Sequence, residues 1–384
     1  MKIIIAMDSF KGTLTAPEAC EIIADAVAET IPDAHLVIKP MADGGEGTAR
    51  AMIKAANGQW IRRTVMGPLP DMQVETGFAW FGDSKTALVE MASASGLELL
   101  SKEQMNPLKT TTYGTGQLIK AALEYGACKI LLAVGGSATV DGGVGAATAL
   151  GWKFLDDEGN EIALGGAGLE GIAKIVEPKP PLLSSVRKTR GSIAPVEVLC
   201  DVDNPLCGEH GAARVYGPQK GASPRMAEQL EKCLAHLAAI VQKHLQRDIN
   251  NVPGAGAAGG LAAGALAFMN AALVSGIETV MARSNLQAEL GSADWVITGE
   301  GSFDCQSLRG KVVSGIAKMA SESHTNLAVL AGQVTVPQQE YQKLGIITAI
   351  GCRTDDMSLD YALKNCRPLL SRAAQQFAKE HLSR

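Results

Sequence analysis

Chemically reactive side chains gather where apolar runs of this 384-residue chain end. The run 295–298, for example, is followed within thirteen residues by two carboxylates and two cations. Because open α/β sheets bind ligands at the carboxyl ends of their strands, each such polar segment predicts a site. The segments contain Glu300, Asp304 and Lys311; Asp8, Ser9 and Lys11; and Asp43 and Glu46.

The carboxylates and lysines of these segments suit acid–base chemistry and anion binding. Glu300 and Asp304 could serve as a general base or as metal ligands. The alternative is that Asp304 or Ser307 caps a helix. Lysines beside glycine suggest phosphate or carboxylate contacts, although isolated lysines are usually solvated. The lysines in such settings are Lys11, Lys220 and Lys311.

A pair of aspartates follows the apolar run that begins at Val196. Asp201 and Asp203 are two positions apart, with Asn204 beside them. If extended backbone continues past the strand, both carboxylates face the same way and could bind Mg²⁺. An Asx turn before Pro205 is the alternative.

Two glycine-rich segments could cradle phosphate groups. The segment 135–143 follows a predicted strand and contains Gly135, Gly136, Ser137, Thr139 and Asp141, so its amides and hydroxyls could bind phosphate oxygens. A tight turn without a ligand is the alternative. The second segment matches G-x-G-x-x-G but has no strand before it, so an anion at a helix N-terminus is favoured over a nicotinamide site. Its glycines are Gly254, Gly256 and Gly259.

The order of predicted elements indicates two domains. Both ends of the chain alternate strands and helices, which predicts a doubly wound parallel sheet, whereas the middle begins with an antiparallel meander. We therefore expect a discontinuous domain of residues 1–60 and 290–384, with an α/β or α+β domain of residues 61–289 inserted and a cleft between the two. The main predicted strands are 3–7, 36–41, 61–65, 74–80, 85–91, 129–134, 196–201, 295–298, 327–331 and 346–350, and the main helices 16–31, 48–56, 116–125, 224–245, 311–320, 337–343 and 358–382.

Composition excludes several classes of protein. A net charge of −5 and a pI near 5.8 give no attraction for nucleic acid or anionic lipid. No apolar run approaches the roughly 20 residues of a membrane span. The eight cysteines form no C-x-x-C pair, which predicts free thiols and a cytoplasmic location. A P-loop motif is also missing from the sequence.

Seven motifs in this order resemble the bacterial type I glycerate kinases over essentially the whole chain. They are D-S-F-K-G from Asp8, A-D-G-G-E-G-T from Ala42, V-G-G-S-A-T-x-D-G-G from Val134, C-D-V-x-N-P-L from Cys200, G-P-Q-K-G-A from Gly217, P-G-A-G-A-A-G-G from Pro253 and I-T-G-E-G from Ile297. The resemblance implies ATP-dependent phosphorylation of D-glycerate to 2-phosphoglycerate, with Mg²⁺. It also implies a discontinuous flavodoxin-like domain with an inserted α/β domain.

On this resemblance we assign the site residues as hypotheses. ATP phosphates would lie on segments 135–139 and 254–260, with Mg²⁺ on Asp201 and Asp203. Lys220 or Lys311 would neutralise the transferred phosphoryl group. Glycerate would lie near Ser9, Lys11 and Asp43, with Asp8 and Glu46 in the same two loops. Glu300 or Asp304 would orient or deprotonate the attacking hydroxyl.

Four positions depart from the family pattern, and two other functions compete. Met7, Val140, Ser302 and Val313 stand where the family usually has Pro, Asn, Arg and Pro. The changes at 302 and 313 leave room for a non-catalytic relative that binds a sugar acid. A dehydrogenase of small hydroxy acids is the other alternative, and it would need a strand before Gly254.

Overall fold

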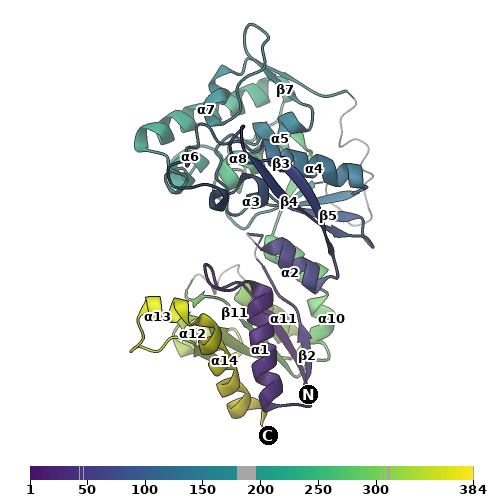
Figure 1. The fold of residues 1–384 in the computed structure, drawn as a ribbon, viewed down its shortest axis with the longest axis vertical. Coiled ribbons are helices and arrows are strands. Elements are labelled where there is room, and N and C mark those ends of the chain that lie inside the picture. Colours follow the sequence, from purple (N-terminus) through teal and green to yellow (C-terminus); the bar gives the residue numbers. More distant parts are fainter. Residues whose placement is uncertain (43, 46, 180–195, 306, 309–311, 384) are drawn as a thin grey trace. The chain divides into compact units, whose positions relative to one another are not determined.

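The computed structural model describes residues 1–42, 44–45, 47–179, 196–305, 307–308 and 312–383. The chain divides by contact into two compact units (Figure 1). The first unit is Met1–Asp43, Arg50–Gly58 and Ile277–Arg384, and the second is Gly44–Ala49 and Gln59–Gly276. One five-stranded parallel sheet and one six-stranded mixed sheet make this an α/β protein, as predicted.

The first unit is built on the parallel sheet, whose strands come from both ends of the chain. The strand order is β15-β13-β11-β1-β2. The central strand β11 pairs with β1, which comes from the opposite end of the sequence, and Met7 lies opposite Gly299. The strands are β1 (Lys2–Met7), β2 (His35–Ile38), β11 (Trp295–Gly299), β13 (Asn326–Ala331) and β15 (Ile346–Gly351); β12 (Ser302–Phe303) and β14 (Gln333–Val334) form a separate small pair.

Helices of the first unit begin and end close to their predicted limits. Thr15 and Glu18 form the capping box that starts α1. The predicted terminal helix 358–382 is wrong as one piece, because it breaks at Asn365 and restarts with Pro368 in its first turn, where a missing N–H is tolerated. The helices are α1 (Ala16–Thr30), α2 (Thr48–Ala55), α9 (Gly276–Arg283), α10 (Leu286–Leu290), α11 (Val312–Glu322), α12 (Gln338–Gln342), α13 (Leu359–Lys364), α14 (Cys366–Phe377) and a π-helical turn, Ala378–Leu382.

The second unit is built on the mixed sheet, with strand order β10-β9-β6-β5-β4-β3. The predicted meander is confirmed for β3, β4 and β5, which are antiparallel. The sequence did not reveal that β5, β6, β9 and β10 continue this sheet in parallel. The strands are β3 (Gln59–Met66), β4 (Gln73–Phe81), β5 (Thr86–Glu90), β6 (Lys129–Ala133), β9 (Val196–Leu199) and β10 (Ala271–Val274), with a separate hairpin β7 (Lys153–Leu155) and β8 (Lys174–Val176).

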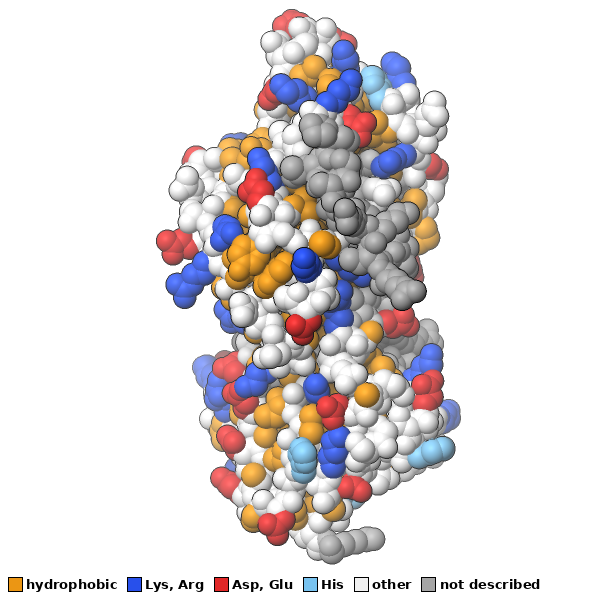
Figure 2. Space-filling model, turned by 90° about the vertical axis from the view of Figure 1, so that its right-hand side faces the viewer, with side chains coloured by type: hydrophobic (Ala, Val, Ile, Leu, Met, Phe, Trp, Pro, Cys, Tyr) orange, Lys and Arg blue, Asp and Glu red, His pale blue; other side chains and the backbone are white. Residues whose placement is uncertain are grey.

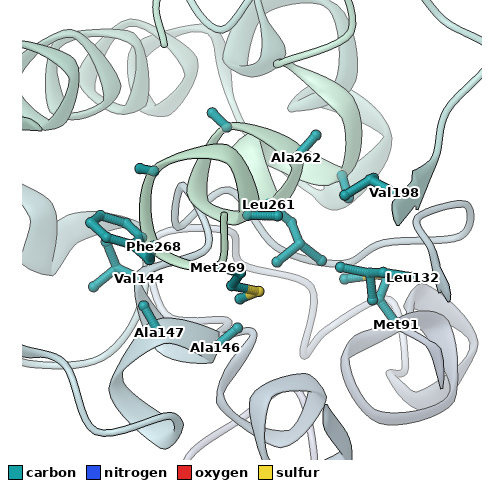
Figure 3. Packing of buried hydrophobic residues seen from close by; sticks show 14 of the residues in the cluster. Met91, Leu132, Val144, Ala146, Ala147, Val198, Leu261, Ala262, Phe268 and Met269 are labelled. Carbon is teal, nitrogen blue, oxygen red and sulfur yellow. The ribbon is translucent and has the colours of Figure 1, made fainter. Parts of the chain in front are cut away.

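Small residues let the helices of the second unit pack closely on its sheet. Leu261 and Ala262 of α8 point into a core that also receives Leu132 and Val198 from the sheet (Figure 3). Ala146 of α5 lies in the same cluster. The helices are α3 (Ala92–Ser95), α4 (Tyr113–Tyr125), α5 (Val144–Ala149), α6 (Ala212–Tyr216), α7 (Pro224–Leu245) and α8 (Ala257–Phe268), with short 3₁₀ turns at Leu97–Leu99, Gly166–Gly171 and Pro218–Lys220.

Charged side chains of both signs are interspersed over the face drawn in Figure 2, with apolar side chains scattered between them. This mixture agrees with the small net charge. Among the described residues, every helix is too short or too polar to cross a bilayer.

Candidate active site

The carboxyl edge of the first sheet brings Asp8 and Glu300 together. Asp8 follows β1 and Glu300 follows β11, and the Asp8 amide donates to the Gly299 carbonyl at 2.9 Å. A Cβ on Gly299 would lie 1.7 Å from the Leu330 carbonyl, so only glycine fits where β11 passes β13. The strand-end rule therefore located two carboxylates on neighbouring strands.

The loops that follow these strands stay in contact. A Cβ on Gly301 would lie 3.5 Å from the Cα of Phe10 and 3.7 Å from the amide of Lys11. The Lys11 side chain is exposed, whereas Asp8 and Ser9 are half-buried and the Asp8 carboxylate accepts from the Ser9 amide at 2.6 Å. A carboxylate and an exposed cation thus share one short loop.

Arg353 is a cation at this edge that the sequence reasoning missed. Its amide donates to the Gly332 carbonyl at 2.9 Å, and its guanidinium donates to the Gln333 side-chain oxygen at 3.5 Å. The Gln333 amide group in turn donates to the Ser302 hydroxyl at 3.0 Å. Arg353 lies two residues after the end of β15, so the strand-end rule could have found it. Ser302 therefore lies in a polar chain that ends at an arginine.

Asp304 lies in a turn that Ser307 fixes. The Ser307 hydroxyl accepts from the Asp304 amide at 3.2 Å and donates to the Ser302 carbonyl at 3.2 Å. These bonds close a turn and are not the helix cap considered for Ser307, which would need an amide later in the chain; the Asp304 carboxylate is half-exposed. Three predicted site residues, Asp43, Glu46 and Lys311, lie outside the described residues.

The carboxyl edge of the second sheet receives a segment from near the N-terminus. A Cβ on Gly44 would lie 3.0 Å from the Cβ of Leu199, the last residue of β9. The Ala49 amide donates to the Glu90 carboxylate at 2.6 Å, at the end of β5. Glu90 is buried and ends an apolar run, which hid it from the sequence analysis. Gly44 and Ala49 therefore contact the ends of two strands that are far from them in sequence.

Asp201 and Asp203 lie exposed at the same edge. The Asp201 carboxylate accepts from the Gly276 amide at 3.1 Å. The neighbouring Asn204 is used internally, because its amide group donates to the His210 carbonyl at 2.9 Å and its oxygen accepts from the Tyr216 hydroxyl at 2.6 Å. The described residues contain no group of three or more His, Cys, Asp or Glu placed to hold a metal ion.

The glycine-rich segment 135–143 is mostly interior. Gly136 is exposed and Gly135 half-buried, but everything from Ser137 onward is buried. Asp141 accepts from the Thr112 amide at 2.7 Å and from the Gly143 amide at 3.1 Å. Burial raises the pKa of Asp141, and these donors oppose that rise. Asp141 therefore holds the loop rather than facing a ligand.

A run of three threonines anchors this loop from outside the motif. The hydroxyl of Thr110 donates to the Ala138 carbonyl at 2.8 Å, and that of Thr112 donates to Asp141 at 2.9 Å. Thr111 reaches the same carboxylate at 3.4 Å. The only sequence signal for this role is the triplet of hydroxyls just before α4.

Lys220 requires a correction. We expected it to face a phosphoryl group, but its side chain is 1% exposed and its ammonium group donates to the Thr139 carbonyl at 2.7 Å. Burial lowers its pKa to about 7, against an opposing effect of the Asp141 carboxylate. A group enclosed in this way does not reach a ligand at the surface.

The segment 254–260 also differs from the expectation. It is buried, and α8 becomes regular only after Gly260, because Ala258, Gly259 and Gly260 have left-handed backbones. Its glycines serve close packing, since a Cβ on Gly256 would lie 2.3 Å from the Pro205 carbonyl. The segment follows α7 and a loop rather than a strand, so the dinucleotide context is missing from this described part of the chain.

Comparison with known proteins decides the family. The model of the glycerate kinase family matches residues 3–382. The chain belongs to the glycerate kinase family. Among its relatives, a glycerate 2-kinase of Escherichia coli K12 is 43% identical over 98% of this chain and 97% of its own. A glycerate kinase of Halalkalibacterium halodurans is 43% identical over 98% and 97% of the two chains.

A solved structure agrees with this assignment. A protein of Salmonella typhimurium LT2, provisionally named glycerate kinase 2, superposes with a TM-score of 0.84 at 41% sequence identity. The match covers 99% of this chain and 98% of the other. The predicted family is thereby confirmed, and with it a phosphotransferase.

Proposed function

We propose that this chain transfers the γ-phosphoryl group of ATP to the 2-hydroxyl of D-glycerate and releases ADP and 2-phosphoglycerate. The full-length match to the glycerate kinase family carries this proposal. The name of the Escherichia coli relative, glycerate 2-kinase, supports the choice of hydroxyl. The same match supports a cytoplasmic metabolic enzyme that acts on small molecules.

We propose that glycerate binds at the carboxyl edge of the first sheet. Lys11 would pair with its carboxylate, because an exposed ammonium group suits a carboxylate anion. Ser9 and Asp8 would bind its hydroxyl groups, together with Asp43 and Glu46. The shared loop geometry of Lys11, Phe10 and Gly301 supports this placement.

Glu300 is the first candidate for the base, with Asp304 as the second. The acceptor hydroxyl attacks the γ-phosphorus while the bond from that phosphorus to the ADP oxygen breaks. The hydroxyl proton passes to the carboxylate, and a cation, for which Lys311 is the candidate, balances the charge on the moving phosphoryl group. Lys11 and the carboxylate thus act on neighbouring groups of glycerate, its carboxylate and its 2-hydroxyl.

We propose that ATP and Mg²⁺ bind at the carboxyl edge of the second sheet. Gly135, Gly136 and Ser137 would contact phosphate, since Gly136 is exposed there. Asp201 and Asp203 fit Mg²⁺ because both are exposed and their ligand atoms are carboxylate oxygens. This ion commonly binds one or two carboxylates together with substrate phosphates. When bound, Mg²⁺ would supply charge neutralisation to the phosphates.

The other residues predicted to bind the nucleotide would support its site without touching it. Thr139, Gly254, Gly256 and Gly259 would shape the nucleotide site from behind, because all four are buried. We further propose a flavodoxin-like architecture for the first unit, with the second unit as the inserted domain. The five parallel strands drawn from both chain ends support this proposal.

Phosphorus NMR of the product from D-glycerate, ATP and Mg²⁺ tests the function and the regiochemistry together. A phosphate on the 2-oxygen has one neighbouring C–H and should give a doublet, whereas the 3-phosphate has two and would give a triplet. A triplet would reject the 2-hydroxyl, and the absence of any new phosphoester and of ADP would reject the kinase assignment in favour of a non-catalytic relative.

Two substitutions separate the proposed half-sites. Lys11→Ala should raise KM for glycerate by roughly tenfold to a hundredfold, because one charge-assisted contact is lost, and should leave KM for ATP nearly unchanged. Asp203→Asn should show the reverse pattern. Lys318→Ala and Asp157→Asn remove equally exposed charges elsewhere and serve as matched controls. Wild-type kcat/KM in both site variants would discard these assignments.

A further inference from the structure

Lys220 is a buried cation for which the proposed chemistry has no direct use. Its side chain is 1% exposed, at the end of the 3₁₀ turn Pro218–Lys220. An ammonium group loses its hydration on burial, and an apolar side chain of similar length would fill the same space without that loss. Packing alone therefore does not explain why a lysine occupies this buried position.

The contact of Lys220 is with the main chain of the glycine-rich loop. Its ammonium group donates to the Thr139 carbonyl at 2.7 Å. Gly259 packs against the same carbonyl, because a Cβ on Gly259 would lie 1.9 Å from its oxygen. The Thr139 hydroxyl is itself buried and has no hydrogen-bond partner among the described residues. Thr139 is thus enclosed at its backbone, by Lys220 on one side and by the left-handed residues in the first turn of α8 on the other.

The next peptide groups of the loop are fixed from a different direction. Ala138 donates to the Ser95 carbonyl at 2.9 Å and accepts from the Thr110 hydroxyl at 2.8 Å. Asp141 accepts from the Thr112 amide at 2.7 Å. Lys220 adds to this frame. Gly135 and Gly136 are the accessible end of the loop, where the Gly136 carbonyl accepts from the Leu97 amide at 2.9 Å, and the rest of the loop is buried.

We propose that Lys220 is a positioning residue for nucleotide binding, which acts through the Thr139 carbonyl to fix Gly135–Ser137 in the conformation that accepts the ATP phosphates. This proposal rests on the function proposed above. Lys220 touches neither substrate; its effect is to reduce the conformational freedom that the phosphate-binding segment must lose when ATP binds.

The test compares Lys220→Met with Lys232→Met, which removes an exposed lysine of α7. Calorimetry with ADP and Mg²⁺ should show affinity weakened by about tenfold or more in Lys220→Met, with KM for ATP raised in parallel. KM for D-glycerate should stay within about twofold of wild type, because its site lies on the other sheet. A loss of fold alone would not split the two substrates in this way. Lys232→Met should match wild type throughout.

Lys220→Gln keeps a hydrogen-bond donor without the charge and should fall between Lys220→Met and wild type. Three results would overturn the proposal: wild-type ADP affinity in a folded Lys220→Met, equal rises in KM for both substrates, or loss of the cooperative thermal transition in both substitutions, which would make the lysine a requirement of the fold. A wild-type chain that neither binds ADP nor releases it would instead reject the proposed function itself.

Discussion

Lys220 and Asp141 show what burial does to single residues near the glycine-rich loop. Burial lowers the pKa of Lys220 to about 7 and raises the pKa of Asp141, and the carboxylate partly opposes the change at the lysine. Below about pH 7 the lysine is charged in both the folded and the unfolded chain, so it adds no pH dependence there. Above that pH the unfolded chain still holds the proton that the folded chain has released.

The free energy of unfolding should therefore rise with pH because of Lys220. Between about pH 7 and 10, the difference between wild type and Lys220→Met should change by up to about 1.4 kcal/mol per pH unit in favour of wild type. Urea unfolding of both proteins at several pH values in this range measures the difference, in which the other lysines cancel. Parallel profiles would show that the lysine keeps an ordinary pKa.

Candidate site residues could be predicted from the sequence where they directly follow a strand. Residues whose partners are far away in the sequence could not be predicted. Asp8, Glu300 and Asp201 follow apolar runs, and the structure places all three at strand ends. Glu90 ends an apolar run without a glycine beside it, and Thr112 reaches Asp141 across 29 positions. Nothing local to either residue reports these partners.

Among the elements, the loop 135–143 and the start of α8 pack closely, and the Gly142 amide donates to the Gly259 carbonyl at 3.1 Å. Gly259 has a φ of +65°, and a Cβ there would lie 1.9 Å from the Thr139 carbonyl. Gly159 has a φ of +86° but would meet no atom within 4 Å. Both glycines have a left-handed backbone, but only Gly259 is tightly packed. Comparing substitutions at the two positions therefore separates the cost of the backbone conformation from the cost of packing.

Gly259→Ala should destabilise the chain by at least about 2 kcal/mol more than Gly159→Ala, because only the first adds an overpacking penalty to the left-handed backbone. Gly159→Ala alone should cost about 1–2 kcal/mol. Denaturant unfolding of the two variants beside wild type gives the comparison. Equal losses would mean that α8 can shift away from the loop without penalty.

Elements were predicted best where local signals set them. The capping box starts α1 at the predicted residue, and α7 runs from Pro224 to Leu245 as its periodicity indicated. The parallel half of the second sheet escaped prediction, because register between strands such as β6 and β9 depends on packing across tens of residues. The left-handed backbone in the first turn of α8 escaped prediction because glycine permits this conformation without specifying it.

For the whole molecule, each unit has a core drawn from its own part of the chain. Every buried member of the larger apolar cluster lies between Val65 and Met269. The cluster of the first unit instead combines residues from Ile3 to Val27 with residues from Trp295 to Leu382. Most contacts of helices α9 and α10 are with the first unit, which begins again at Ile277. The domain boundary predicted from the sequence, at residue 290, placed these helices in the second domain.

This difference predicts that the two units depend differently on chain continuity. A polypeptide of residues 59–276 contains the whole larger cluster and should unfold cooperatively on its own, with a native-like far-UV circular dichroism spectrum. It lacks the Ala49 amide, which donates a hydrogen bond to the Glu90 carboxylate in the full chain, so the second unit should be less stable alone than in the full chain. Residues 1–58 alone should stay unfolded, because β1 then has no β11 to pair with. Thermal denaturation followed at 222 nm tests both, and a non-cooperative melt of 59–276 would mean that the second unit needs the first in order to fold.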